Sequence, residues 1–424
     1  MSTIGNVANF DFTITSKPWR TLMSIFSKTL KTSSTRASRR HRNKNGRKIR
    51  VEKLGERKLM AADFGGLGDF YGPLSPVDDA AAEVSTMNTT SASQGSSNLV
   101  SVDSMGQAVE FELIGGELFV TGTNQHDNVT LTNNYNTGMI EFSANSYDNW
   151  GILVGQATGT VAMDEVSQVR ADMHQGNDVL NANIGITPVI ANGGYGNDTL
   201  ISGNGDDQLR GDQGNDVLRG GYGNDVLNGG SQNDRIYGGY GNDIISGETG
   251  NDILEGQGDD DRIWGGDGDD TIRGGDGDDA IYAENGHDRV FAQAGNDFIS
   301  GGAGNDLLSG GNGNDILHGD DGNDTMHGNG GNDTMMGWNG NDYMYGGSGS
   351  DKMYGKEGTD ELRGGSGNDL LDGGDDGNRD RLYGQSGRDT FVKHEGFWSD
   401  DPDVFLDYVA NNDLIHVNSW WSWN

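Results

Sequence analysis

The chain has 424 residues, of which 72 are glycine and only 32% are hydrophobic, and its formal net charge is −36. This composition is a poor source of a conventional hydrophobic core, so apolar burial alone is not expected to hold the fold together. The absence of cysteine excludes disulfides, thiolate zinc sites and a cysteine nucleophile, and no apolar run reaches transmembrane length.

The first part of the chain, residues 1–62, is a basic arm in front of an acidic body. Residues 1–58 hold fifteen lysines and arginines against three acids, whereas the remainder holds fourteen bases against 62 acids. The acidic body argues against nucleic acid as a partner, because phosphates would be repelled, and it favours cations. We expect the arm to be disordered, and residues 63–100, rich in glycine, serine and threonine, to form a flexible linker.

The end of the basic arm resembles a short N-terminal motif, Leu-Glu-Pro/Asp-Arg-x-Leu-Leu-Ala, found in large exported and surface proteins of one group of aquatic bacteria. Four residues match it: Leu54, Arg57, Leu59 and Ala61. Gly55 stands where the motif has glutamate, and Met60 replaces its second leucine. The resemblance implies that the arm is a targeting segment that is removed from the mature protein.

Residues 101–191 have the alternating pattern of short β-strands. Apolar residues alternate with glutamates over 109–113, and a Gly-Gly pair supplies a two-residue turn before the next strand. Further short strands are expected at 128–132, 138–143, 151–154, 159–163 and 166–171. The segments around Asp127 and Asp178 look like degenerate forerunners of the repeat that follows. We therefore expect an irregular, β-rich N-terminal cap on the repeats, whose end units are usually atypical.

A nine-residue repeat fills residues 192–392. Aspartate recurs every nine residues from Asp198 to Asp369, and an apolar residue follows two positions after each aspartate. With aspartate at position 6, the unit reads Gly-Gly-x-Gly-Asn/Asp-Asp-x-apolar-x. Positions 1 to 6 predict a turn, and positions 7 to 9 predict a three-residue strand whose position 8 points inward. Two units then complete one coil of 18 residues, and the coils stack in parallel as two facing sheets.

The repeat also predicts the ligands of a metal. Aspartates of alternate units stack on the same edge, where like charges repel, and a hard dication between each pair would turn repulsion into attraction. Calcium suits such a site better than magnesium, because it accepts six to eight oxygens in flexible geometry. We therefore expect Ca²⁺ ions at twenty aspartates and a repeat region that folds when calcium binds. The candidate ligands are Asp198, Asp207, Asp216, Asp225, Asp234, Asp243, Asp252, Asp261, Asp270, Asp279, Asp288, Asp297, Asp306, Asp315, Asp324, Asp333, Asp342, Asp351, Asp360 and Asp369.

The unit resembles the calcium-binding nonapeptide of the RTX (haemolysin-type) family. The resemblance implies an all-β fold, a right-handed parallel β-roll (a β-helix solenoid) with irregular caps at both ends, calcium in its turns, and secretion. The residues of 390–424 predict two or three strands that close the C-terminal end of the stack. The resemblance implies that residues 393–424, the C-terminal cap, are a candidate secretion signal. Several units depart from the pattern and predict weaker sites: Gln232, Asp259, Ala283, Glu284, His287, Ser350 and Thr359.

Other groups have simpler interpretations. His394-Glu395 begins like a zinc-protease helix but lacks the second histidine, so no catalysis is expected there. The tryptophans of 420–423 predict a packed cap. Six aromatic residues occupy position 9 and are expected to be exposed: Tyr237, Trp264, Tyr282, Phe291, Tyr345 and Tyr354.

The leading hypothesis is a non-enzymatic, calcium-binding β-roll, extracellular or at the cell surface, with a structural, adhesion or matrix role. Two alternatives stay open at this point. One is a membrane-active, haemolysin-like toxin, although the sequence lacks the long apolar helices that such an activity needs. The other is the non-catalytic part of a secreted hydrolase. A cell-surface or matrix partner, the secretion route, cleavage of the arm, the oligomeric state and the occupied calcium sites are left open.

Overall fold

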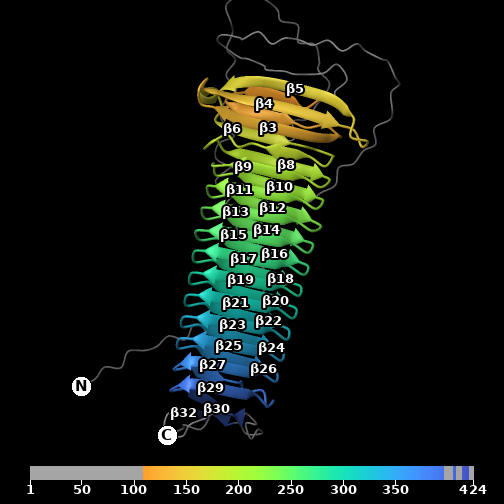
Figure 1. The fold of residues 1–424 in the computed structure, drawn as a ribbon. Coiled ribbons are helices and arrows are strands. Elements are labelled where there is room, and N and C mark those ends of the chain that lie inside the picture. Colours follow the sequence, from red (N-terminus) through yellow and green to blue (C-terminus); the bar gives the residue numbers. More distant parts are fainter. Residues whose placement is uncertain (1–107, 396–403, 407–412, 420–424) are drawn as a thin grey trace, which may run out of the picture. The chain divides into compact units, whose positions relative to one another are not determined.

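The computed structural model describes residues 108–395, 404–406 and 413–419, and these form two sheets that face each other and have parallel strands through the repeats. The chain alternates between the sheets, so that even-numbered strands of the repeats lie in one sheet and odd-numbered strands in the other (Figure 1). Each sheet has 16 strands. The predicted stack of two-unit coils is therefore confirmed.

Sheet A contains, in spatial order, β1 (Glu110–Ile114), β2 (Glu117–Thr121), β6 (Gln168–Asp172), β8 (Val189–Tyr195), β10 (Gln208–Gln213), β12 (Val226–Ser231), β14 (Ile244–Thr249), β16 (Arg262–Asp267), β18 (Ala280–Asn285), β20 (Phe298–Ala303), β22 (Ile316–Asp321), β24 (Thr334–Asn339), β26 (Lys352–Glu357), β28 (Leu370–Asp372), β30 (Thr390–Glu395) and β32 (Leu414–Ser419). Sheet B contains β5 (Leu153–Ala162), β4 (Met139–Tyr147), β3 (His126–Asn134), β7 (Val179–Asn181), β9 (Thr199–Gly203), β11 (Val217–Tyr222), β13 (Arg235–Tyr240), β15 (Ile253–Gly258), β17 (Thr271–Asp276), β19 (Arg289–Ala294), β21 (Leu307–Asn312), β23 (Thr325–Gly330), β25 (Tyr343–Ser348), β27 (Glu361–Gly367), β29 (Arg381–Gly387) and β31 (Val404–Phe405). One 3₁₀ turn, η2 (Met163–Glu165), precedes β6.

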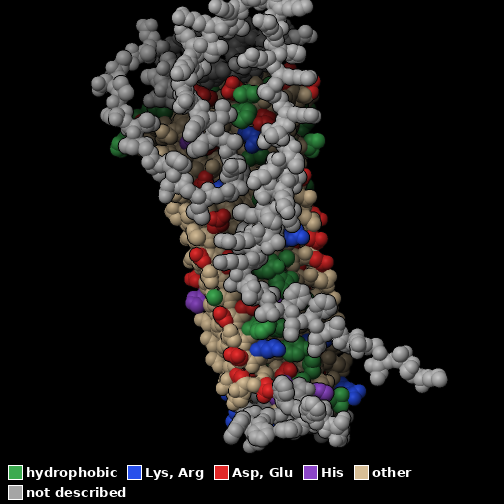
Figure 2. Space-filling model, turned by 180° about the vertical axis from the view of Figure 1, so that it is seen from behind, with side chains coloured by type: hydrophobic (Ala, Val, Ile, Leu, Met, Phe, Trp, Pro, Cys, Tyr) green, Lys and Arg blue, Asp and Glu red, His purple; other side chains and the backbone are tan. Residues whose placement is uncertain are grey.

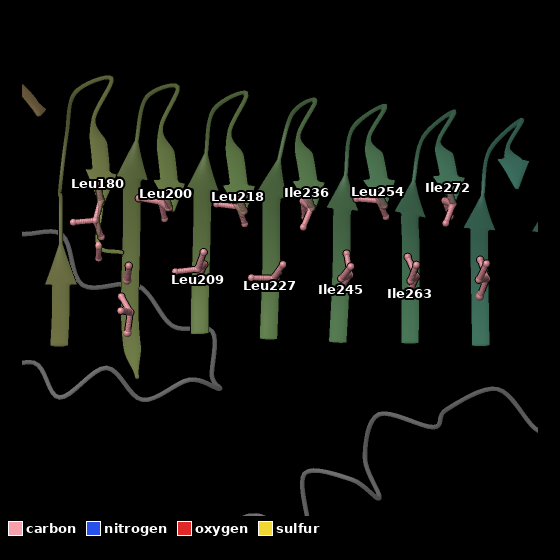
Figure 3. Close-up of a cluster of buried hydrophobic side chains, with 14 of the residues drawn as sticks. Leu180, Leu200, Leu209, Leu218, Leu227, Ile236, Ile245, Leu254, Ile263 and Ile272 are labelled. Carbon is pink, nitrogen blue, oxygen red and sulfur yellow. The ribbon is translucent and has the colours of Figure 1, made fainter. Parts of the chain in front are cut away.

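The core of the repeats is a double row of position-8 side chains. Leu218 pairs in register with Ile236, eighteen residues later, and both are fully buried. The side chains of the two sheets point toward each other between the sheets (Figure 3). Met326, Met335, Met344 and Met353 take the same place in four successive units and are likewise fully buried. The predicted inward direction of position 8 is confirmed, and these methionines fill the core.

The strands of the repeats are longer than the sequence predicts. A typical strand such as β13 has six residues, not three, because it continues from positions 7 to 9 into positions 1 to 3 of the next unit. The pairing of Gly221 with Gly239 and of Tyr222 with Tyr240 shows why. Backbone groups in this glycine-containing stretch find partners in the neighbouring coil, so the turn shortens to the residues around the aspartate.

The N-terminal end differs from the repeats because its strands are antiparallel. Strand β4 pairs in antiparallel fashion with both β3 and β5, and β1 pairs with β2 in the same way. The predicted separate strands at 151–154 and 159–163 are wrong, since β5 is one continuous strand of ten residues. Gly159 belongs to it for a packing reason: a Cβ there would collide with the ring of Phe142 on β4.

The C-terminal end continues the stack. Strands β30, β31 and β32 pair in parallel with earlier coils, which agrees with the prediction of two or three strands after the repeats. The basic arm, the linker and the tryptophans of 420–423 lie outside the described residues. Within the described part of the chain, no helix is long and apolar enough to cross a membrane.

Candidate calcium-binding ladders

The repeat aspartates form two hydrogen-bonded rows, which we call the inner ladders. In each row, the backbone N–H of one aspartate donates to Oδ1 of the aspartate one coil further on. Asp252 N, for example, lies 2.7 Å from Asp270 Oδ1, and Asp270 N lies 2.7 Å from Asp288 Oδ1. The first inner ladder precedes the strands of sheet B, and the second precedes those of sheet A. The predicted stacking of alternate aspartates is therefore observed for all twenty.

The inner ladders extend beyond the twenty predicted residues. At the N-terminal end, Asp127 N donates to Asp178 Oδ1, and Asp178 N donates to Asp198 Oδ1, both at 2.7 Å. At the C-terminal end the rows continue to three further aspartates: Asp380, Asp389 and Asp413. The strict nine-residue count missed these five residues. The forerunner segments around Asp127 and Asp178, and the return of the period after a two-residue insertion, were the available signals.

In the repeats, the two oxygens of each ladder carboxylate have different surroundings. Oδ2 of Asp178 and of all twenty predicted aspartates is buried and has no hydrogen-bond partner among the described residues. Burying an unpaired carboxylate oxygen is costly, so a polar or charged partner is expected beside it. Through the repeats, the inner ladders are thus two lines of carboxylate oxygens that no described group of the chain satisfies.

In most units, a glycine at position 1 leaves room beside the unpaired oxygen. A Cβ on Gly301 would lie 2.6 Å from Asp306 Oδ2 and 2.8 Å from the carbonyl oxygen of Gly319 in the next coil. The same relation recurs at position 1 along the repeats. A carboxylate oxygen and a backbone carbonyl oxygen therefore face one small space, which a glycine leaves open and a larger side chain crowds.

Burial makes these carboxylates weak acids. Desolvation raises the pKa of Asp234, Asp261 and Asp270 to about 8 from the ordinary value of 3.8. The backbone hydrogen bond to Oδ1 lowers each pKa, and the neighbouring aspartates of the same row raise it further. The weaker shifts, to about 6 at Asp252 and Asp342, have the same leading cause. Each ladder carboxylate therefore favours a bound cation or proton over solitary negative charge.

Position 5 forms a second, outer pair of ladders with the opposite direction. There the side-chain oxygen of one coil accepts from the backbone N–H of the next, as from Asn323 N to Asn305 Oδ1 at 2.8 Å. These residues are exposed. His287 replaces the amide with Nδ1, 2.8 Å from Asn305 N, and Ser350 uses Oγ, 3.3 Å from Asn368 N. Position 5 thus links neighbouring turns, and position 6 carries the unpaired charge.

The donor set of the inner ladders fits calcium. Ca²⁺ takes carboxylate and carbonyl oxygens in flexible geometry, and both kinds of oxygen face the space beside position 1. Among the described residues, no group of three or more acidic or histidine side chains converges in the manner of a compact side-chain metal centre. This agrees with a site that draws on backbone oxygens. Bound calcium would neutralise the rows, while Oδ1 keeps its hydrogen bond to the preceding coil.

Two other sequence predictions concern the position-9 aromatic residues and His394. The position-9 aromatic residues are half-buried, not exposed, because they pack on neighbours of adjacent coils: Trp264 stacks on Tyr282 with ring centroids 5.7 Å apart. Arg219 lies over Tyr237 at 4.9 Å in the same way. His394 lies on a strand and not on a helix, and its Nε2 is 2.7 Å from Asp372 Oδ1, within hydrogen-bond distance.

These features define a parallel β-solenoid whose turns carry rows of buried carboxylates. Residues 190–391 match the family model of the RTX calcium-binding nonapeptide repeat, in successive and overlapping stretches. The solenoid is therefore an RTX repeat region, and the resemblance stated from its sequence is confirmed. A comparison with curated proteins finds no match.

Proposed function

We propose that the chain is a calcium-dependent structural protein of the extracellular space or cell surface, whose repeats fold into the solenoid when Ca²⁺ binds to the inner ladders. The observation that carries the proposal is the set of 21 buried Oδ2 atoms without a hydrogen-bond partner in the described part of the chain. The ligands would be these oxygens together with carbonyl oxygens of the turns.

Several features support the extracellular part of the proposal. The RTX resemblance implies secretion, and the segment around Arg57 resembles an export-associated motif. Calcium sites of extracellular modules have dissociation constants of about 0.1 to 1 mM, so repeats of this affinity would stay loose in the cytosol and fold outside. The structural or adhesive role rests on the way the repeat is used. Positions 5 and 6 link neighbouring coils, position 8 fills the core, and position 9 packs on adjacent coils.

Calcium titration followed by circular dichroism and sedimentation velocity tests this proposal. In excess chelator near pH 8, we expect weak β signal and an expanded chain; calcium should restore a compact β-structured form, whereas magnesium, which prefers strict octahedral geometry, should not. An equal β signal and equal sedimentation coefficient in chelator and in calcium would contradict the proposal. Fractionation of the producing cells, with detection of the chain in the medium or at the surface, tests the location separately.

A further inference from the structure

Two departures from the repeat pattern meet at one place on sheet A. The first is the step from Asp369 to Asp380, which has eleven residues where the repeat has nine. The second is the replacement of the position-2 glycine by Trp338 and Lys356 in successive strands, β24 and β26, of this sheet. The inserted residues follow β28, the next strand of the same sheet. Other residues also replace this glycine elsewhere, as Gln293 and Asn329 do, but here an aromatic and a basic side chain lie next to the insertion.

The backbone at Trp338 has the left-handed conformation that position 2 adopts along the repeats, also where Gln293 or Asn329 stands there. The φ of Trp338 is 73°, in the left-handed region that glycine adopts freely and that bulky residues avoid. Lys356 has a φ of 82°. The Trp338 side chain stays 42% exposed, so core packing does not explain its presence. Among the described non-glycine residues with a positive φ, Trp338 has the largest side chain.

These residues line a surface groove of about 1130 Å³. Tyr354, Asp372 and His394 also line it, and the last two are joined by the 2.7 Å contact. The Lys356 amine lies 5.9 Å from the Trp338 ring centroid and 5.3 Å from that of Tyr354. On the other side, the inserted loop is held by Asp376, whose Oδ2 accepts from Gly358 N at 2.6 Å. The groove is therefore built from fixed parts.

A row of rings connects the groove with the rest of sheet A. Trp264, Tyr282, Phe298, His318 and Trp338 come from successive strands, β16 to β24, and neighbouring ring centroids are 5.3 to 6.3 Å apart. Figure 2 shows one long face of the column, with hydrophobic side chains along its middle and acidic side chains toward its edges. The groove is thus the end of a track along the solenoid, which suits a chain-like ligand better than a compact one.

We propose that this groove binds a neutral polysaccharide chain. Sugars present C–H faces to aromatic rings and hydroxyls to carboxylates, amides and amines, and the groove offers both kinds of surface. Its carboxylates, Glu357, Asp372, Asp375 and Asp376, outnumber its one lysine, so an acidic polysaccharide or nucleic acid would be repelled. The charged lining is equally unsuited to a lipid chain. This proposal deepens the structural role proposed above, because it names a partner for the folded solenoid.

The test measures binding of defined hexasaccharides to the full chain in saturating calcium by isothermal titration calorimetry. Cellohexaose, laminarihexaose and mannohexaose are the neutral probes; hexagalacturonate is the acidic probe and a chitosan hexamer the cationic one. We expect at least one neutral hexasaccharide to bind, with little dependence on salt. Trp338→Gly should weaken that binding about tenfold, since it removes one aromatic contact. Lys356→Gly should weaken it to a smaller extent.

Both substitutions restore the glycine of the repeat at a positive φ, so they should not harm the fold. Gln293→Gly is the matched control, because Gln293 has the same position-2 backbone, with a φ of 84°, but lies on β19 of sheet B. Failure of all neutral probes, unchanged binding in Trp338→Gly, or binding of the chitosan hexamer alone that high salt abolishes would each overturn the proposal. Circular dichroism of each variant in calcium and in chelator separates this result from failure of calcium-dependent folding.

Discussion

Asp127 and Asp270 belong to the same inner ladder but differ in what surrounds the second carboxylate oxygen. Thr123 donates to Asp127 from its backbone N, 2.6 Å from Oδ2, and from its hydroxyl. Oδ2 of Asp270 has no partner among the described residues. The protein thus closes the N-terminal end of the ladder with its own donors, and leaves the repeats to be completed by a cation.

The same contrast holds for the core. Around β3, β4 and β5, several buried side chains come from each strand, and Phe111 stacks on Phe142 with centroids 4.2 Å apart. In the repeats, each nine-residue unit contributes one large apolar side chain, while its glycines raise the entropic cost of folding. We infer that apolar burial is the main stabilising term at the N-terminal end. In the repeats, the main term would be the cation or protons that neutralise the ladder carboxylates.

Removal of calcium should produce the largest difference in stability between the repeats and the N-terminal end. In chelator at pH 8, amides of the repeats, for example in β11 to β25, should lose protection from hydrogen exchange. The expected gain in exchange rate is about 1,000-fold or more, equivalent to about 4 kcal/mol. Amides of β3 to β5 should keep most of their protection. Hydrogen–deuterium exchange with mass spectrometry measures both regions in one sample, and equal protection of the repeats with and without calcium would refute the comparison.

Acid pH should partly replace calcium. The folded pKa of Asp270 and Asp261 is raised to about 8 from 3.8, so the folded repeats bind protons more tightly than the unfolded chain. That stabilisation is complete below about 3.8 and is lost as pH rises through about 6 to 8. Metal-free protein should therefore show more β signal at pH 5.5 than at pH 8.5.

Protons and calcium should also compete for the same oxygens, so the calcium midpoint should rise as pH falls from 8 to 6. Circular dichroism at several pH values checks both effects. The sign is the decisive result: metal-free repeats that gained structure with rising pH would show that the ladder carboxylates are not the controlling groups.

A single substitution can distinguish the contribution of the inner ladder to stability from that of the outer ladder. Asp270→Asn keeps an oxygen for the hydrogen bond from Asp252 N but replaces the unpaired Oδ2 by an amide nitrogen. In calcium we expect a loss of about 1–3 kcal/mol and a higher calcium midpoint. In chelator the change should be neutral or stabilising, because like charges in the row decrease.

Asp269→Asn is the matched control for this change. Asp269 is exposed at position 5, and its Oδ1 accepts from His287 N at 2.9 Å, a role that asparagine fills in many other units. Its effect should stay within about 0.5 kcal/mol in chemical denaturation. Equal losses for both variants in calcium would mean that general charge, and not the inner ladder, sets stability.

The sequence predicts the regular part of this molecule well because a strict period leaves little freedom. The spacing of Asp198 and the apolar residue at Leu200 suffices for the coil length, the two sheets and the stacked carboxylates. The outcome at other places depends on partners that are distant in sequence. Asp127 meets Asp178, 51 residues away, and the length of each strand depends on pairing with the next coil. The groove at Trp338 becomes visible only when three coils are placed side by side.

The smallest expected change in stability comes from filling the space beside the ladder carboxylates at position 1. In Gly265→Ala, the new Cβ would lie 2.5 Å from both Asp270 Oδ2 and the carbonyl oxygen of Ala283, so it would crowd the two oxygens offered to calcium. Ala283 and Ala292 occur naturally at position 1, so the fold accommodates a methyl group there, and we expect a loss of only about 1 kcal/mol, at the low end for overpacking. Gly258→Ala is the control, because its Cβ would meet nothing closer than Tyr240 Cδ1 at 3.4 Å. That variant should be neutral or more stable by about 0.4–1 kcal/mol, through a less flexible unfolded chain. A calcium midpoint that moves for Gly258→Ala as much as for Gly265→Ala would show that position 1 is not beside the bound ion.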